Sequence, residues 1–266
     1  MAVILEGGCR VSDMREGEPL ISGTMRVWQQ IGRATGASAI SLRVMEFAPG
    51  LSPTTSNPDC DEILYVLDHA HPAGNKVTST RVSGSVNLLI DGCRHEIGPD
   101  TGIYLRPKQT FAIDNPSTYS IVIISSQCPD PNVPPQFVSP EISSDKYLDN
   151  PLPIVRLTDR PAQPTANRWY RVLVDTQIGS DQVTQFVGSI PPGRAPDHFH
   201  NYEEVLFILS GEGQMWAGET NTPIAVGSCI YLPKGQVHCV ENTGEGELRL
   251  LGVFYPAGSP SVRYDV

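Results

Sequence analysis

The feature that most constrains the fold is a succession of short apolar runs, each bounded by Gly, Pro, Asn, Asp or another polar residue. Seven such runs, five to eight residues long and rich in Val, Ile, Leu and Phe, cover residues 41–47, 62–67, 86–90, 120–125, 183–190, 204–209 and 248–254. Runs of this length and composition predict β-strands. Helical periodicity over 11 or more residues is hard to find, and 24 prolines and 24 glycines interrupt the chain throughout. The sequence therefore predicts an all-β protein.

The two halves of the chain resemble each other in four segments that recur in the same order. Residues 40–50, 61–67, 103–105 and 112–115 of the first half parallel residues 183–193, 203–209, 230–232 and 239–242 of the second. Four matched segments in register indicate an internal duplication. Between the halves, residues 128–153 are rich in proline and poor in apolar clusters, which is typical of a linker. We therefore expect two domains, 1–140 and 141–266.

Composition excludes several classes of function. A net charge of −10 argues against nucleic acid as a partner, because phosphate binding requires basic patches. No apolar run approaches the roughly 20 residues of a membrane helix, and the N-terminal residues lack the basic start of a signal peptide. The six cysteines include no CxxC pair, which favours reduced thiols. We expect a cytoplasmic protein without a membrane or nucleic-acid partner.

The second half contains a cluster of metal-ligand residues. His198 and His200 alternate along the chain, so they share a face if the segment is extended, and Glu204 has the same parity. His238 must arrive from another strand, after the turn at Pro233 and Gly235. Imidazoles with one carboxylate are typical ligands of Fe²⁺, Mn²⁺, Ni²⁺, Cu²⁺ or Zn²⁺. The sequence predicts one divalent metal ion held by these four residues.

The spacing of these residues resembles the two signature motifs of the cupin superfamily, G-x5-H-x-H-x3-4-E-x6-G and G-x5-P-x-G-x2-H-x3-N. The second motif matches at every specified position, from Gly227 to Asn242, whereas the first has four residues in place of five between Gly193 and His198. The resemblance extends through the internal repeat to most of the chain. It implies a bicupin, with two tandem jelly-roll β-barrels, the metal inside the second barrel, and a homodimer.

The first half lacks the corresponding ligands. The repeat alignment places Ser56 opposite His198, Pro58 opposite His200, and Phe111 or Ala112 opposite His238, so that only Glu62 matches its counterpart. One carboxylate does not hold a transition metal tightly, and we expect the first barrel to be metal-free. An unorthodox site at Cys60 is the alternative.

The three other histidines are weaker candidates for metal ligands. His69 and His71 form an HxH pair, but the repeat places them on a turn, which favours a solvated loop. His95 lies in a segment that reads as a polar turn.

A metal bound by three histidines and a glutamate keeps open positions for a substrate or dioxygen. Our leading hypothesis is an Fe²⁺- or Mn²⁺-dependent dioxygenase acting on a small organic molecule, with Glu204 as a catalytic ligand. The alternatives are a non-redox isomerase, lyase or hydrolase, and a non-catalytic binding protein.

Substrate contacts are harder to predict. An apolar pocket could be formed by Phe186, Phe199, Trp216, Tyr231 and Phe254, although aromatic residues are more often plain core. Gln185 and Arg249 interrupt apolar strands, and each would meet a polar substrate if it faced the barrel interior, or solvent if it did not. An inward Arg249 would favour an acidic substrate. We therefore take Gln185, Tyr231 and Arg249 as candidate substrate-binding residues.

Overall fold

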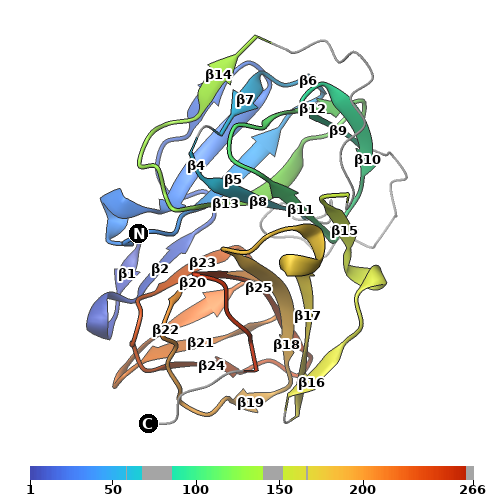
Figure 1. The fold of residues 1–266 in the computed structure, drawn as a ribbon. Helices are drawn as coiled ribbons and strands as arrows, with labels where there is room; N and C mark the ends of the chain where they lie inside the picture. Colours follow the sequence, from blue (N-terminus) through green and yellow to red (C-terminus); the bar gives the residue numbers. More distant parts are fainter. Residues whose placement is uncertain (58, 68–85, 140–151, 166, 262–266) are drawn as a thin grey trace.

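The computed structural model describes residues 1–57, 59–67, 86–139, 152–165 and 167–261 and is built almost entirely of β-strands. Figure 1 shows two β-barrels, one formed mainly by the first half of the chain and one by the second. The strands of the first half are β1 (Val3–Ile4), β2 (Arg10–Asp13), β3 (Leu20–Ser22), β4 (Met25–Ile31), β5 (Leu42–Phe47), β6 (Gly50–Leu51), β7 (Thr54–Ser56), β8 (Asp61–Val66), β9 (Val86–Ile90), β10 (Cys93–Ile97), β11 (Thr101–Leu105), β12 (Thr110–Asn115), β13 (Ile121–Cys128) and β14 (Gln136–Val138).

The strands of the second half are β15 (Ile154–Arg156), β16 (Gln163–Thr165), β17 (Arg168–Val174), β18 (Thr184–Ile190), β19 (Gly193–Arg194), β20 (Glu203–Ser210), β21 (Glu212–Ala217), β22 (Thr220–Ala225), β23 (Ser228–Leu232), β24 (His238–Asn242) and β25 (Leu248–Tyr255). Short 3₁₀ helices cover Glu6–Gly8 (η1), Arg33–Thr35 (η2), Leu157–Asp159 (η3) and Thr176–Ile178 (η4). Each of the seven predicted apolar runs forms a strand. Across the described residues, no helix is long and apolar enough to cross a membrane.

The strand order confirms the duplication. The large sheet of the first barrel runs β11-β8-β13-β5-β4-β3, and that of the second runs β23-β20-β25-β18-β17-β16, which is the same order of equivalent strands. The smaller sheets correspond as well, with β10-β9-β12 matching β22-β21-β24. Each barrel is thus two sheets packed face to face, as the cupin resemblance implies.

The barrels exchange strands at their outer edges. β2, from the N-terminal end of the chain, pairs with β23 of the second barrel, and β15 pairs with the equivalent strand β11 of the first barrel. The expected boundary between 140 and 141 lies in the segment 140–151, outside the described residues. Part of the expected linker is ordered in a sheet, because β14 pairs with β7. These exchanged strands tie the two barrels together.

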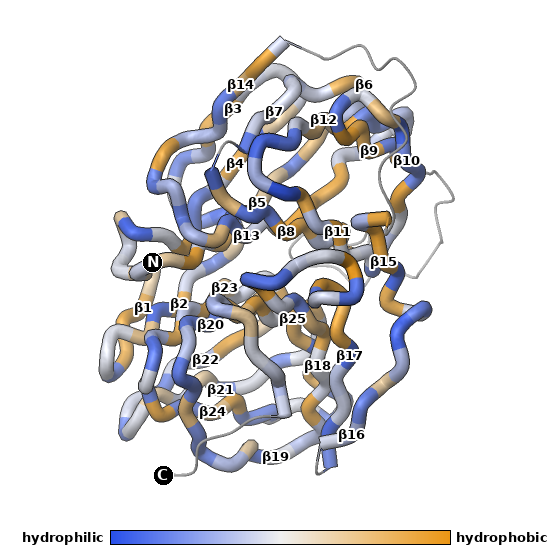
Figure 2. The backbone as a smooth tube through the Cα atoms, viewed as in Figure 1, coloured by the Kyte–Doolittle hydropathy of each residue, from blue (hydrophilic) through white to orange (hydrophobic). Residues whose placement is uncertain are grey.

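The apolar residues form three clusters. One fills the first barrel around Met45, Leu64 and Ile123, and one fills the second around Phe186, Leu206 and Phe254. The third draws on both halves and occupies the space between the large sheets; its buried members include Trp28, Val44, Tyr65, Tyr104, Val187, Phe207, Tyr231 and Val253. In Figure 2 apolar colour concentrates on strands within the barrels and where they meet. The central strands of the large sheets, such as β8 and β18, are therefore buried on both faces.

The fold also decides two smaller expectations, on His95 and on the cysteines. His95 lies in β10 and not in a polar turn, because residues 93–97 pair in register with β9. The six cysteines are all free thiols, as their scattered spacing predicts. The HxH pair at His69 and His71 lies outside the described residues.

Candidate metal centre

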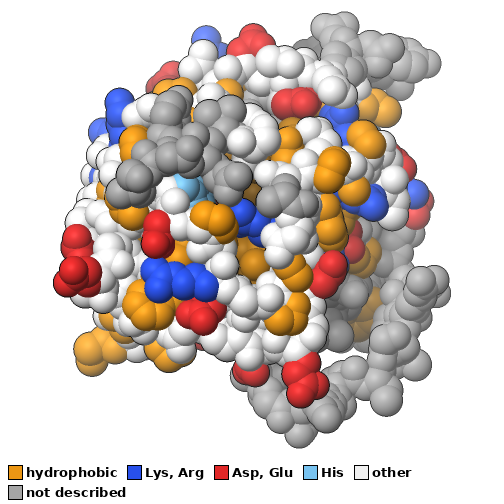
Figure 3. Space-filling view, turned by 90° about the horizontal axis from the view of Figure 1, so that it is seen from below, with side chains coloured by type: hydrophobic (Ala, Val, Ile, Leu, Met, Phe, Trp, Pro, Cys, Tyr) orange, Lys and Arg blue, Asp and Glu red, His pale blue; other side chains and the backbone are white. Residues whose placement is uncertain are grey.

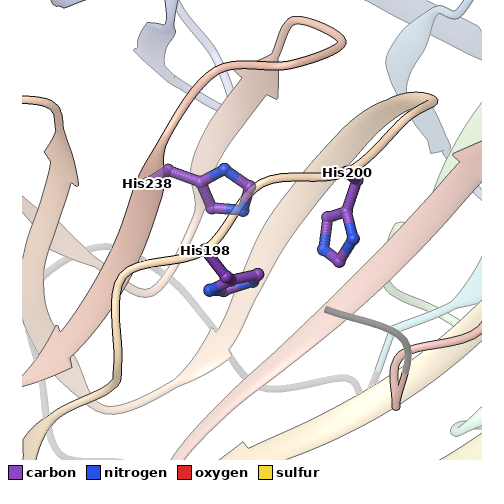
Figure 4. A group of neighbouring side chains, drawn as sticks. All are labelled: His198, His200 and His238. Atoms are coloured by element: carbon purple, nitrogen blue, oxygen red, sulfur yellow. The ribbon is translucent and has the colours of Figure 1, made fainter. Parts of the chain in front are cut away.

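Three histidines converge inside the second barrel (Figure 4). His238 is the first residue of β24, and its backbone exchanges two hydrogen bonds with His198, of 2.8 and 3.1 Å. His200 lies just before β20, where its carbonyl oxygen accepts a hydrogen bond from the Gly235 amide at 2.8 Å. One ligand nitrogen from each imidazole lies within 4.8 Å of the other two. Elsewhere in the described residues, no other group of three or more His, Cys, Asp or Glu residues has this spacing.

Backbone carbonyls orient two of the rings. The Nδ1 atom of His198 lies 3.0 Å from the carbonyl oxygen of Pro196, and that of His238 lies 2.8 Å from the carbonyl oxygen of Gln236. A carbonyl oxygen can only accept a hydrogen bond, so in the neutral imidazole each Nδ1 carries the proton and each Nε2 presents a lone pair. This is the arrangement by which proteins fix metal-binding imidazoles. The residues present therefore fit a transition-metal ion.

Glu204 completes the donor set from β20. Its Oε2 atom lies 3.7 Å from His200 Nε2 and 3.6 Å from His238 Nε2, and the three side chains are almost fully buried. A buried carboxylate is costly unless it is paired or binds a metal. Glu204 thus lies beside two of the three histidines, where it can contribute a negatively charged oxygen ligand.

The electrostatics keep His198 neutral. Burial is the main cause that lowers the pKa of His198 to about 4, and the nearby His238 lowers it further. At neutral pH its imidazole therefore offers a lone pair and does not need to lose a proton before binding a cation.

A small cavity of about 90 Å³ adjoins the histidines. Its wall is mostly apolar and includes Phe186, Leu250 and Phe254. Among the lining residues that the structure describes, Arg168 is the one permanently charged cation. Arg168 pairs directly with Thr165 in the β16–β17 hairpin, and both residues line the cavity. In Figure 3 histidine is visible on the face opposite the first barrel, among apolar side chains.

Sequence reasoning missed Arg168. The residue lies thirty positions before the first histidine and outside both motifs. Strand alternation is the available signal, since it puts Arg168 on the same face of β17 as the core residue Tyr170, but only the fold brings that face to the histidines.

The three predicted substrate-binding residues lie away from the histidines. The Gln185 amide donates to the carbonyl oxygen of Leu64 in the first barrel, at 3.4 Å. The Tyr231 hydroxyl donates to Glu203, and Arg249 lies 3.8 Å from Asp100 of the first barrel. All three face the junction between the barrels, on the opposite side of the sheet from the histidines, because the first barrel covers the face that an isolated barrel would expose.

The expected aromatic pocket is only partly present. Phe186 and Phe254 line the cavity. Tyr231 packs in the cluster between the barrels, and Trp216 stacks under the guanidinium of Arg194 at 4.2 Å. Phe199 is not among the residues that line the cavity.

The first barrel has different residues at the equivalent positions, and the repeat alignment was wrong there by one residue. Thr55 pairs with Phe111 as His198 pairs with His238, and the Lys108 amide donates to Asn57 as the Gly235 amide donates to His200. The true counterparts of His198 and His200 are thus Thr55 and Asn57, not Ser56 and Pro58, and Pro58 itself lies outside the described residues. The cause is one extra residue between Asn57 and Glu62, compared with His200 and Glu204.

An arginine occupies the region of the first barrel that corresponds to the metal centre. The Arg43 guanidinium lies 2.5 Å from Glu62 and 2.9 Å from the hydroxyl of Ser125, and the Gln127 amide donates to both Glu62 and Asn57. Arg43 and Glu62 are almost fully buried. The register equates Arg43 on β5 with Phe186 on β18. A cation from the chain itself thus neutralises Glu62, the counterpart of Glu204.

Among the described residues, no cluster of metal-ligand side chains surrounds Cys60. Its thiol donates to the Asn57 side chain at 2.6 Å, and burial raises its pKa to about 12. It is therefore a protonated thiol and not the thiolate that metals bind.

Comparisons with known proteins support the fold. Residues 186–254 match the family model of the cupin domain. The oxalate decarboxylase of Bacillus subtilis, solved as a deletion variant, superposes with a TM-score of 0.72 at 13% identity, over 94% of this chain and 78% of that one. A Pseudomonas aeruginosa protein solved under the name of a glyoxylate-induced protein gives a TM-score of 0.70 at 16% identity, over 97% of this chain and 93% of that one.

Among sequence relatives, the auxin-binding protein 1 of Arabidopsis thaliana is 32% identical over 117 residues, and the oxalate-binding protein of Thermotoga maritima is 36% identical over 66 residues. The matches cover 38% and 24% of this chain, and 59% and 54% of the respective relatives. Taken with the repeated strand order and the histidine triad that the described residues contain in the second barrel alone, these matches show that the chain belongs to the cupin superfamily and has the bicupin fold.

Proposed function

We propose that the second barrel is a catalytic unit that binds one redox-active divalent ion, Fe²⁺ or Mn²⁺, and oxidises a small carboxylate with dioxygen. The observation that carries the proposal is the juxtaposition of the histidine triad and Glu204 with a small cavity in which Arg168 is the one permanent cation among the described lining residues. When bound, such an ion would pass electrons to dioxygen and would also act as a Lewis acid towards a carboxylate.

The cavity supports a small substrate. A dry cavity of about 150 Å³ is known to hold benzene, whereas this cavity measures about 90 Å³. A carboxylate of two to four carbons is of the right size. Two of the similar proteins are named for oxalate, a two-carbon dicarboxylate.

Charge supports the substrate class. Arginine presents a planar set of donors that matches a carboxylate, and its charge persists at all physiological pH values. Arg168 would bind one carboxylate end of the substrate, with the Thr165 hydroxyl beside it, while the histidine end of the cavity receives the other. The side chains of Phe186 and Phe254 would exclude water and strengthen these interactions.

The four ligands would contribute differently because their charges differ. His198, His200 and His238 would hold the ion through neutral nitrogens, whereas Glu204 adds a negative charge that favours higher oxidation states. Glu204→Gln should therefore reduce turnover more than metal retention, because three imidazoles still hold the ion.

The experiment compares metals and oxygen. Protein purified anaerobically and loaded separately with Fe²⁺, Mn²⁺ or Zn²⁺ is given oxalate, glyoxylate, malonate and pyruvate, and dioxygen uptake is recorded with product analysis. We expect turnover with Fe²⁺ or Mn²⁺ that requires dioxygen, and none with Zn²⁺, whose filled d shell has no redox chemistry. Equal activity with Zn²⁺, or full activity without dioxygen, would refute the oxidative reaction in favour of Lewis-acid chemistry.

A second candidate is binding without turnover, which the match to the oxalate-binding protein favours. In that case calorimetry would show a carboxylate bound to the metal-loaded protein, and product analysis would show it unchanged after incubation with any of the three metals and dioxygen.

A further inference from the structure

A second and larger cavity lies between the two barrels. It measures about 590 Å³, and it is lined by Met14, Arg15, Glu46, Tyr65, Leu67, Asp100, Ser120, Val122, Phe207, Leu209, Ser210, Val226 and Arg249. Small-molecule sites in proteins are commonly 300–1,000 Å³ and occur preferentially between domains. The cavity between the barrels has both properties, and none of its residues belongs to the metal centre.

The sheet of the second barrel separates this cavity from the metal cavity. Leu206 on β20 and Leu250 on β25 line the metal cavity, whereas their neighbours Phe207 and Arg249 line the cavity between the barrels. Successive residues of a strand point to opposite faces, which explains the division. The two cavities are therefore separate from each other, one on each face of the same sheet.

The interior of this cavity combines an apolar wall with an incompletely paired arginine. Leu67, Val122, Phe207 and Leu209 supply apolar surface from both barrels. The acidic neighbour of Arg249 is Asp100, but the separation is 3.8 Å.

The acidic neighbour of Arg249 already accepts a hydrogen bond from another residue. The same Asp100 oxygen already accepts a hydrogen bond from the Tyr65 hydroxyl at 2.5 Å, and the Nε atom of Arg249 is buried without a hydrogen-bond partner. Leaving a charged donor unpaired in a buried position is unfavourable, so this atom favours an added acceptor.

The other arginine among the described lining residues has a closer acidic partner, which it shares. Arg15 lies 3.0 Å from Glu46, which also pairs with Arg26 at 3.3 Å. Among the described lining residues, Arg249 thus has the longer ion-pair separation and an unpaired Nε donor, and it lies next to the apolar wall.

We propose that the cavity between the barrels binds a small organic anion with an apolar body. Its carboxylate or sulfonate pairs with Arg249, and its ring or aliphatic part packs against Val122 and Phe207. Because the cavity draws residues from both barrels, the bound anion also stabilises their junction. This site does not depend on the metal centre or on the reaction proposed for it.

The probe is 8-anilino-1-naphthalenesulfonate, an anion with an aromatic body whose fluorescence rises in apolar surroundings, titrated into the full-length protein. We expect saturable binding of one probe per chain. Arg249→Gln should weaken binding about tenfold or more, because a hydrogen bond to a charged group is lost. Val122→Phe should also weaken binding, because it places a ring where the apolar part of the anion packs, without removing a charge.

Two controls make the result specific. Arg94→Gln removes an equally positive side chain from the exposed pair with Asp114 and should leave the affinity unchanged. N-phenyl-1-naphthylamine, which has the same rings without the sulfonate, should bind the wild-type protein more weakly and should be insensitive to Arg249→Gln. Circular dichroism and thermal unfolding verify that each variant is folded.

The outcomes are decisive even if the Val122→Phe variant does not fold. A tenfold loss in Arg249→Gln that is absent in Arg94→Gln supports the site, whereas equal affinity in these two variants overturns it. Non-saturating binding, or binding of several probes per chain with unchanged affinities in the variants, likewise overturns it.

Discussion

Replacing Arg43 with methionine should test whether the arginine of the first barrel neutralises the carboxylate that a metal would otherwise meet. The Arg43 and Glu62 side chains are 1% and 0% exposed, and the guanidinium lies 2.5 Å from the carboxylate. The variant leaves Glu62 with the Ser125 hydroxyl and the Gln127 amide, but without a cation. Removing one partner of a buried ion pair costs about 3–5 kcal/mol. We expect Arg43→Met to lower the free energy of unfolding by that amount.

The double variant Arg43→Met, Glu62→Leu should be much less destabilised than the single one. Replacing both members of a buried pair with apolar groups of similar volume is often neutral or stabilising. The surface variant Arg94→Met is a matched control, because its pair with Asp114 is 62% exposed on the arginine side and should contribute less than about 1 kcal/mol.

The assay is urea unfolding followed by tryptophan fluorescence. Trp28 is buried in the junction cluster and reports on the first barrel if Trp169 and Trp216 are replaced by phenylalanine in all variants. A cost below about 1 kcal/mol for Arg43→Met, or a double variant no more stable than Arg43→Met, would refute the reasoning.

The remaining predictions concern the second barrel. Elemental analysis should find one metal ion per chain, and two would contradict the interpretation of the first barrel. His200→Ala should weaken metal binding by more than about 100-fold, since loss of mere supporting contacts already costs 10–100-fold, while the circular dichroism spectrum stays unchanged. The pKa of His198 is about 4 in the folded protein and 6.5 in an unfolded chain, so the unfolded chain binds the additional proton between these values. The metal-free protein should therefore lose up to roughly 3 kcal/mol of stability as the pH falls from 6.5 to 4, and pH-independent unfolding would contradict this. Arg168→Gln should raise the KM for a carboxylate at least about tenfold with Arg156→Gln unaffected, and an unchanged KM would exclude Arg168 from substrate binding.

Local patterns in the sequence were sufficient for the strands, the duplication and the histidine triad. A run such as 204–209 carries its own strand propensity, and cupin-like spacing brings His198 and His200 together with His238 because the two segments exchange backbone hydrogen bonds. The ligand set follows from short distances along the chain and one strand pairing, so the motif is enough to predict it.

Other features depended on which surfaces meet in the folded chain. Alternation along β18 and β25 divides the side chains between the two faces of the sheet. It does not say that the first barrel covers one of these faces, which is the face that carries Gln185 and Arg249. The same applies to Arg43, whose burial beside Glu62 depends on the packing of β5 against β8 through β13.

The tertiary structure alone also decided the exchanged strands and the two cavities. β2 and β15 each pair across the junction of the barrels, and Arg168 reaches the histidines from a hairpin thirty residues earlier in the chain. Spacing within a motif fixes chemistry at the scale of a few residues. The shape and charge of a cavity instead arise from contacts between segments that are distant in sequence, where no local periodicity specifies the partner.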